Sequence, residues 1–457
     1  MGEFFGTDGI RGVAGRFPLD KATIARIGYA LVEELRLAGE ATPLIVIGRD
    51  TRESGVWMEQ AFAAGIQAAA GEFKIAGVIT TPGVAFLTRT LPAAAGVVIS
   101  ASHNSYEDNG LKVFGPTGRK LSDALEQAIE RDLKSEQEVS GVPKAVGADA
   151  MEADPSLKVS YLQFLRDEIG RGLSLSGLKL AIDCAEGASF DIAPELFRSL
   201  GATVEAIHTT PNGRNINLDC GSLHPEDLQQ RVLSSGADLG IAFDGDADRL
   251  ILVDGSGRLL DGDYVLFILA EHLDLGGKLA GRRVVATGMS NLGLEAALRD
   301  RGISLARTSV GDKYVLEELL ASDGSLGGEQ SGHIIFPEIS LAGDGMITAL
   351  EVLRVMTESG RSIADLAEGM QHYPQLTLNV PVVRKPPLES IEPLWDAIVR
   401  LERHLGQEGR LLVRYSGTEN LLRIMIEGKD EETIRLQAET LAKIVREHLG
   451  TAQQASV

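Results

Sequence analysis

One pattern constrains the fold more than any other: at three places along the chain, a short apolar strand is followed by a polar loop and then by a helix. The strands are expected at residues 44–47, 178–182 and 283–286, and each runs directly into glycine or polar residues. Strands that alternate with helices form βαβ units, and wholly apolar strands fit sheets that are covered on both faces. The pattern therefore predicts three similar α/β domains with mixed, mostly parallel sheets.

The C-terminal region differs from the rest of the chain in its composition and in the elements it predicts. Prolines at positions 374, 381, 386, 387 and 393 indicate a linker or an edge segment. A helix is expected near residues 393–405, two β segments around Leu411 and Ile424, and a last helix from about Asp430. These elements predict a smaller α+β domain. We expect the four domains to occupy residues 1–155, 156–255, 256–370 and 371–457.

Composition and net charge disfavour several classes of binding partner and of structure. The 457 residues carry a formal net charge of -21, which disfavours nucleic acid because its phosphates would be repelled. No stretch approaches the roughly 20 apolar residues that cross a bilayer, so no membrane span is expected. At their spacing, Cys184 and Cys220 predict neither a disulfide framework nor a zinc site. These features favour a protein of the reducing cytoplasm.

The most informative loop carries three carboxylates. The apolar strand expected at residues 239–243 leads directly into Asp244, Asp246 and Asp248. Carboxylates at this spacing repel one another unless a cation holds them, and hard oxygen ligands suit Mg²⁺. An EF-hand is excluded because Arg249 occupies the position of its glycine. The alternative is a solvated acidic turn.

A second strand, at residues 97–99, ends in a loop with Ser102 and His103. The serine is not in a Gly-x-Ser-x-Gly elbow, so esterase-type activation has no support. Downstream, Asp108-Asn-Gly110 is followed by Lys112, which places a cation after a turn. A phosphorylated serine would offer three acceptor oxygens to a metal and to such cations. Taken alone, the segment would be an ordinary turn.

Three glycine-containing segments complete the candidate site. Arg11 lies among glycines near the N-terminus. A loop at residues 327–333 carries Glu329, Ser331 and His333, whose side chains suit sugar hydroxyls and proton transfer. A third segment can hold a phosphate through guanidinium, hydroxyl and backbone groups, and its residues are Arg414, Ser416, Gly417, Thr418 and Arg423. For the first segment the alternative is a fixed N-terminal arm, for the second a buried histidine, and for the third a tight hairpin.

Taken in order, five segments make the chain similar to the α-D-phosphohexomutase family. They are Gly6-Thr-Asp-Gly-Ile-Arg-Gly12, Ser100-Ala-Ser-His-Asn104, Asp244-Gly-Asp-Ala-Asp-Arg249, Gly328-Glu-Gln-Ser-Gly-His333 and Arg414-Tyr-Ser-Gly-Thr-Glu419. The resemblance covers essentially the whole chain. It implies three related α/β domains, a smaller fourth domain and an active site in a central cleft.

The resemblance also implies roles for individual residues. Ser102 would be the phosphoserine, and an oxygen of its phosphate would join three aspartates as Mg²⁺ ligands. Glu329 and Ser331 would bind the sugar. The metal ligands would be Ser102, Asp244, Asp246 and Asp248. The catalytic residues would be Ser102, His103, Lys112, Arg11, Arg249 and His333. The phosphate that is not transferred would be held by Arg414, Ser416, Gly417, Thr418 and Arg423.

The reaction implied by the resemblance is the interconversion of glucosamine 6-phosphate and glucosamine 1-phosphate. It would pass through a bisphosphorylated sugar, which would also serve as activator, and it would feed amino-sugar nucleotide and cell-wall precursor synthesis. Phosphomannomutase or phosphoglucomutase activity is the nearest alternative. A phosphatase with Asp244 as nucleophile and a non-catalytic sugar-phosphate sensor are more distant ones. Association into a homodimer is left open.

Overall fold

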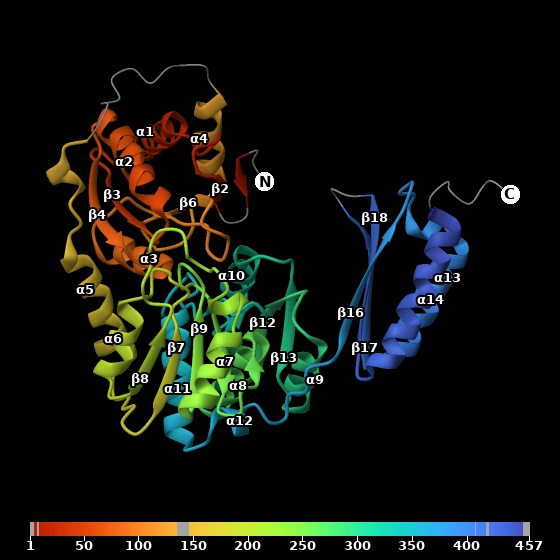
Figure 1. Cartoon of the computed structure of the whole chain (residues 1–457). Coiled ribbons are helices and arrows are strands. Elements are labelled where there is room, and N and C mark those ends of the chain that lie inside the picture. The colour runs from red at the N-terminus through yellow and green to blue at the C-terminus, as the bar shows by residue number, and fades with distance from the viewer. Residues whose placement is uncertain (1–3, 7–8, 135–145, 407, 417–419, 451–457) are drawn as a thin grey trace. The chain divides into compact units, whose positions relative to one another are not determined.

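The structure, a computed structural model, describes residues 4–6, 9–134, 146–406, 408–416 and 420–450 (Figure 1). The chain divides into two compact units. The first comprises Met1–Met289 and Leu305–Glu368, and the second comprises Ser290–Ser304 and Gly369–Val457.

The first sheet of the first unit has six strands in the order β1-β2-β6-β5-β3-β4. Strand β3 pairs in parallel with β4 and β5, whereas β6, β2 and β1 extend the sheet by antiparallel pairing. The strands are β1 (Phe5–Gly6), β2 (Gly9–Val13), β3 (Leu44–Arg49), β4 (Glu72–Val78), β5 (Ala95–Ile99) and β6 (Asp108–Phe114).

Helices cover both faces of this sheet. The crossovers from β3 to β4 and from β4 to β5 run in opposite directions, so their right-handed turns place α2 and α3 on opposite faces. Helix α1 begins after Asp20, whose carboxylate accepts hydrogen bonds from the backbone of Ala22 and Thr23 and so caps the helix. The helices are α1 (Lys21–Leu37), α2 (Glu53–Ala68), α3 (Thr81–Thr90) and α4 (Asp123–Lys134).

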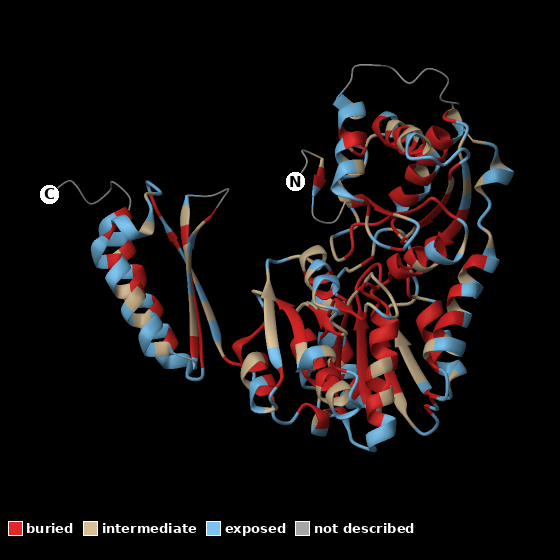
Figure 2. Ribbon diagram, turned by 180° about the vertical axis from the view of Figure 1, so that it is seen from behind, coloured by how far each residue is buried: buried red, intermediate tan, exposed pale blue. Residues whose placement is uncertain are grey.

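The second sheet has the order β11-β10-β9-β7-β8, with β7 parallel to β8 and β9, and with β10 and β11 antiparallel. Every residue of β9 and β10 is buried, and Figure 2 shows such buried central strands beneath partly exposed helices. The elements are α5 (Pro155–Gln163), β7 (Lys179–Asp183), α6 (Ile192–Ser199), β8 (Thr203–Ile207), α7 (Glu226–Ser235), β9 (Leu239–Phe243), β10 (Leu250–Asp254) and β11 (Leu259–Leu260).

The third sheet is smaller and has the order β13-β12-β14-β15. Strand β12 pairs in parallel with β14, and β14 pairs antiparallel with β15. Its strands and the helices of this region are α8 (Gly262–Leu275), β12 (Arg283–Thr287), β13 (Ser304–Thr308), α10 (Asp312–Ala321), β14 (Gly327–Gly328), β15 (Ile334–Ile335), α11 (Gly345–Ser359) and α12 (Ile363–Leu366).

The second unit contains an antiparallel sheet in the order β16-β18-β17. The proline-rich stretch begins as the edge strand β16, in agreement with the expected edge segment. Residues such as Leu394, Ile424 and Leu441 form a common core. The elements are α9 (Leu292–Asp300), β16 (Gln375–Pro381), α13 (Glu392–Leu405), β17 (Gly409–Tyr415), β18 (Leu421–Gly428) and α14 (Glu431–Leu449).

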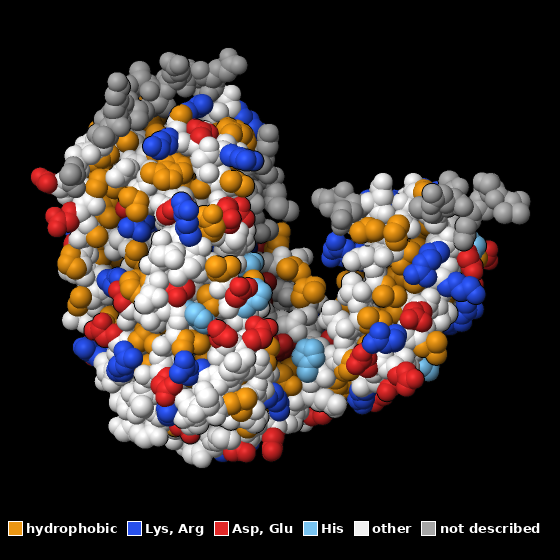
Figure 3. Space-filling model, in the orientation of Figure 1, with side chains coloured by type: hydrophobic (Ala, Val, Ile, Leu, Met, Phe, Trp, Pro, Cys, Tyr) orange, Lys and Arg blue, Asp and Glu red, His pale blue; other side chains and the backbone are white. Residues whose placement is uncertain are grey.

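The predicted fold class is confirmed: three α/β regions with mixed sheets precede a smaller α+β region. The parallel pairings reach the edge strands β4 and β8, but antiparallel strands complete each of the three sheets, so the antiparallel share is larger than "mostly parallel" implies. The four domain boundaries stay a prediction. None of the described helices has the length and apolar character that crossing a bilayer requires. On the face drawn in Figure 3, acidic and basic side chains are interspersed rather than gathered by sign.

Candidate active site

The three aspartates of the metal loop lie where β9 ends. The strand is wholly buried, and it delivers Asp244, Asp246 and Asp248 to its carboxyl end with their side chains also buried. One oxygen from each carboxylate lies within 4.8 Å of the others. Burial and the neighbouring carboxylates Asp248 and Asp246 raise the pKa of Asp244 well above its ordinary value. Such a group of buried acidic oxygens fits a hard divalent cation.

Ser102 lies directly against this loop. It follows β5, and its hydroxyl donates a hydrogen bond to Oδ2 of Asp244 at 2.6 Å. The serine backbone has φ of 52°, in the left-handed region. Nδ1 of His103 is 3.3 Å from the serine Oγ and 3.3 Å from Nη1 of Arg249. The predicted phosphoserine and metal residues therefore meet, although Ser102 and Asp244 are 142 positions apart.

Lys112 supplies a buried positive charge between two of the aspartates. Its Nζ lies 2.8 Å from Oδ2 of Asp246 and 3.3 Å from Oδ2 of Asp248. The lysine is on β6, paired opposite Val98 of β5, so the strand that leads to Ser102 also positions this cation. Burial alone would raise the pKa of Asp248. The neighbouring Lys112 and His333 have the larger combined effect, and they hold the pKa of this carboxyl well below its usual value.

A cavity of about 430 Å³ adjoins these groups. Its lining includes Arg11, Asp248, Arg249, Glu329 and His333. Oε1 of Glu329 accepts a hydrogen bond from the backbone of Gly311 at 3.2 Å, which directs the carboxylate toward the β13–α10 connection. The cavity thus combines two guanidinium groups with carboxylates and an imidazole, a set that can bind a sugar phosphate.

Family models match four consecutive parts of the chain. They describe domains I, II and III and the C-terminal domain of phosphoglucomutase/phosphomannomutase, and they cover residues 2–140, 160–257, 261–373 and 378–444. A phosphoglucosamine mutase of Solibacter usitatus is 48% identical over 451 residues, which are 98% of this chain and 99% of that protein. The chain belongs to the α-D-phosphohexomutase family.

Other similar proteins agree with this assignment. Seven further full-length relatives with the same name are 43–48% identical to this phosphohexomutase. A phosphoglucomutase/phosphomannomutase family protein of Burkholderia thailandensis has the same fold, with a TM-score of 0.76 at 23% identity over 97% of both chains. An Aspergillus fumigatus N-acetylphosphoglucosamine mutase, described in complex with GlcNAc-6P and magnesium, has a TM-score of 0.64 at 18% identity. The match covers 93% of this chain and 97% of that one.

These relatives confirm three expectations from the sequence: the family, the isomerase-class phosphohexomutase activity and the action on glucosamine phosphates. The individual roles of the site residues stay predictions. The distances above show only which of those residues the fold of the phosphohexomutase brings together.

Sequence reasoning missed the residues that hold the serine loop of the phosphohexomutase. Nη2 of Arg52 donates to the backbone oxygens of Ser102 and Asn104 at 3.2 and 2.6 Å. Nδ2 of Asn217 donates to the same two oxygens at 2.9 and 3.0 Å. Arg52 is fully buried and paired with Asp50. In the sequence, the one available signal was the place of Arg52 next to the polar Gly48-Arg-Asp50 loop.

Thr81 was also missed. Its hydroxyl donates to Oδ2 of Asp246 at 2.5 Å, and its backbone N–H donates to the Asp246 carbonyl oxygen at 3.0 Å. Thr81 begins α3 and Asp246 follows β9, so these two bonds fasten the first sheet's helix to the metal loop. Nothing in the sequence near Thr81 marks it as part of a site.

The two histidines of the site have opposite electrostatic surroundings. Burial and the cations Arg249 and Arg11 lower the pKa of His103. Burial opposes protonation of His333 as well, but Asp248 and Asp312 outweigh it and raise the pKa of that imidazole. Its Nδ1 is 3.7 Å from Asp248 and its Nε2 is 3.8 Å from Asp312. His333 is therefore the better proton acceptor of the two.

The predicted phosphate loop belongs to the second unit. Arg414 and Arg423 are direct cross-strand partners on β17 and β18, an arrangement of like charges that an anion would relieve. Nζ of Lys385 donates to the backbone oxygen of Ser416 at 2.7 Å, which adds a cation that the sequence did not indicate. Gly417 and Thr418 lie outside the described residues. In the first unit, Ser331 shares a loop with Glu329 and His333 but is not among the residues that line the cavity.

Proposed function

We propose that this phosphohexomutase interconverts glucosamine 6-phosphate and glucosamine 1-phosphate, with phosphorylated Ser102 as donor and acceptor of the phosphoryl group. One observation carries this proposal: the hydroxyl of Ser102 lies 2.6 Å from Asp244, inside a buried group of three aspartates. A phosphate on that oxygen would stand next to the candidate metal site and near Lys112 and Arg249.

Mg²⁺ is the cation that we propose for the site. The three aspartate carboxylates and one phosphate oxygen would hold it, and oxygen ligands of this kind suit its chemistry. When bound, the cation would neutralise negative charge on the transferring phosphoryl group. The Aspergillus relative that is described with magnesium supports this choice.

The residues of the chain define the steps of transfer. A free hydroxyl of the sugar attacks phosphorus, a new phosphorus–oxygen bond forms, and the bond to Oγ of Ser102 breaks. His333 lines the cavity, and its imidazole is placed to take the proton of the attacking hydroxyl. Arg11, Lys112 and Arg249 offset the charge on the equatorial oxygens, and such preorganised charge is the main source of catalysis in phosphoryl transfer.

The product of this first transfer is a bisphosphorylated sugar. After it reorients, its other phosphoryl group passes back to Oγ of Ser102, and His333 returns the proton to the departing sugar oxygen. The same bisphosphate would load unphosphorylated Ser102, so we propose it as activator. A structure of the Aspergillus relative described with glucose 1,6-bisphosphate is consistent with this role. We place the protein in the cytoplasm and leave homodimer formation open.

The sugar preference is tested by steady-state kinetics with the 6-phosphates of glucosamine, glucose and mannose, each with its matching bisphosphate. We expect kcat/KM for glucosamine 6-phosphate to exceed the other two by at least about tenfold, the equivalent of one well-placed hydrogen bond. Equal or higher kcat/KM for glucose or mannose phosphate would assign the chain to phosphoglucomutase or phosphomannomutase activity. Release of inorganic phosphate without sugar isomerisation would instead support an aspartate-dependent phosphatase.

A further inference from the structure

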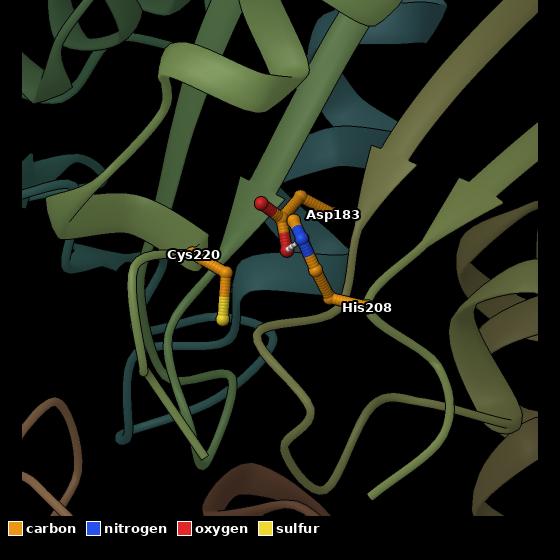
Figure 4. A group of neighbouring side chains, drawn as sticks. All are labelled: Asp183, His208 and Cys220. Atoms are coloured by element: carbon orange, nitrogen blue, oxygen red, sulfur yellow. Dashed lines mark ion pairs between the residues drawn. The ribbon is translucent and has the colours of Figure 1, made fainter. Parts of the chain in front are cut away.

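A second group of metal-ligating side chains lies in the second sheet, apart from the three aspartates. Asp183 ends β7, His208 follows β8, and Cys220 precedes a short 3₁₀ turn (Figure 4). In the part of the chain that the structure describes, one ligand atom from each of these residues lies within 4.8 Å of the others. The cysteine spacing in the sequence gave no sign of such a group, because the partners of Cys220 are an imidazole and a carboxylate rather than Cys184.

Backbone groups hold the carboxylate of Asp183 in place. Its Oδ1 accepts a hydrogen bond from the N–H of Ala185 at 2.8 Å, and its Oδ2 accepts one from Gly221 at 2.9 Å. The side chain is fully buried. Because Gly221 follows Cys220 directly, the second bond also fixes the backbone that carries the thiol. The carboxylate and the thiol are therefore positioned by the fold and not by each other.

His208 points one ring nitrogen at this group and the other at a second carboxylate. Its Nδ1 is 3.0 Å from Oδ1 of Asp183, and Figure 4 shows the ring directed at that carboxylate. Its Nε2 is 3.5 Å from Oδ2 of Asp227 on α7. Metal-binding histidines commonly donate their second ring N–H to a carboxylate, which fixes the tautomer and the orientation of the ring. In His208, Nε2 faces the Asp227 carboxylate in the same sense.

We propose that Asp183, His208 and Cys220 form a second divalent-metal site, suited to Zn²⁺ or a similar ion. One nitrogen, one sulfur and one oxygen ligand match the preferences of Zn²⁺, whereas the three aspartates offer only hard oxygen ligands. Zn²⁺ takes four ligands, and water would fill the remaining position. A cavity of about 350 Å³, lined by His208, Asp227, Gln230 and Arg231 among others, adjoins the imidazole on the side of Asp227.

The surroundings favour a cation at this position. The carboxylates of Asp183, Glu186 and Asp219 act electrostatically on the Cys220 thiol. These negative charges would stabilise a bound divalent cation, which in turn supports a thiolate as its ligand. Bound metal would join β7, β8 and the segment that carries Asn217, the residue that contacts the Ser102 backbone.

Co²⁺ is the probe that separates this site from the three aspartates. The full-length protein is titrated with Co²⁺ in excess Mg²⁺, which occupies the oxygen-only site, and absorption from thiolate-to-cobalt charge transfer is recorded. We expect this absorption in the wild type and in the matched control Cys184→Ser, and its loss in Cys220→Ser. Asp227→Asn removes the negative charge that faces Nε2, so the absorption should remain while the affinity for Co²⁺ falls by about tenfold. Circular dichroism and mutase turnover confirm that each variant is folded.

Three results would overturn the proposal. The first is a wild type without thiolate–cobalt absorption. The second is a folded Cys220→Ser protein that retains it, or a Cys184→Ser protein that loses it to the same extent. The third is unchanged Co²⁺ affinity in Asp227→Asn, whose exposed side chain can be altered without opening a core cavity.

Discussion

At the residue scale, the backbone of the serine loop is strained at Ser102, and hydrogen bonds from neighbouring side chains stabilise it. Ser102 has φ of 52°, a conformation that costs a non-glycine residue about 1–3 kcal/mol. Arg52 and Asn217 each donate to the backbone oxygen of Ser102, so the surrounding structure compensates for that cost. The strain is consistent with a serine whose hydroxyl must meet Asp244 and a phosphoryl acceptor.

The same scale yields a prediction for the metal loop. Asp246→Asn should lower the affinity for Mg²⁺ by on the order of tenfold or more, because a neutral amide replaces one of three anionic ligands. The amide oxygen can still accept the hydrogen bonds of Thr81 and Lys112, so the loop should remain folded. Isothermal titration calorimetry measures the affinity, with the exposed Asp191→Asn as matched control. Equal Mg²⁺ affinities in the two variants would show that the three aspartates do not form the metal site.

At the element scale, secondary structure was predictable where the signal is local. The last helix from about Asp430 and the apolar strand at residues 239–243 are each encoded within a single segment of sequence, and the structure confirms them. The extra antiparallel strands were not predictable. Their pairing depends on how distant segments meet, as when Gly9–Val13 pairs with the strand that carries Lys112.

Helix α2 carries a buried acid whose protonation should affect stability. Burial raises the pKa of Glu59 to about 7, although Arg49 lies 3.5 Å away and opposes this. The folded state therefore binds a proton more tightly than the unfolded state. This contribution to stability is fully present below about pH 4.5 and is lost as the pH rises through about 7.

Glu59→Gln, which cannot ionise, should reduce this loss. At pH 8 the variant should be more stable than the wild type by up to about 3 kcal/mol, whereas at pH 4.5 the two should be similar. Urea unfolding at both pH values measures the difference, and Glu53→Gln, at an exposed position of the same helix, is the control. A stability difference that does not change with pH would contradict the raised pKa.

At the scale of the whole molecule, the motifs that were predicted are compact in sequence, and the residues that were missed are not. Asp244, Asp246 and Asp248 occupy alternate positions of one loop, so their chemistry is visible in a line of sequence. Thr81 reaches Asp246 across 165 positions, and Asn217 reaches Ser102 across 115. Such contacts arise from tertiary placement, and no local pattern encodes them.

The second unit leads to a prediction about substrate binding. If Arg414 holds the phosphate that is not transferred, Arg414→Ala should lower kcat/KM by roughly ten- to more than hundredfold, mainly through KM. A charge-assisted hydrogen bond contributes on the order of 1.5–3 kcal/mol, which gives this range. Steady-state kinetics measure the effect, and Arg435→Ala, exposed on α14 of the same unit, is the control. An unchanged kcat/KM would mean that other residues hold this phosphate.

Transfer of a phosphoryl group to Ser102 is tested most directly by peptide mass spectrometry. The dephosphorylated protein is incubated with Mg²⁺ and glucosamine 1,6-bisphosphate, and each serine-containing peptide is analysed. We expect one phosphate, on Ser102, together with glucosamine monophosphate in equal amount. Ser102→Ala should stay unmodified, fold normally and lose turnover, while Ser105→Ala, in the same loop, should behave like the wild type. Full turnover by Ser102→Ala, or phosphate on a different residue, would contradict the proposed mechanism.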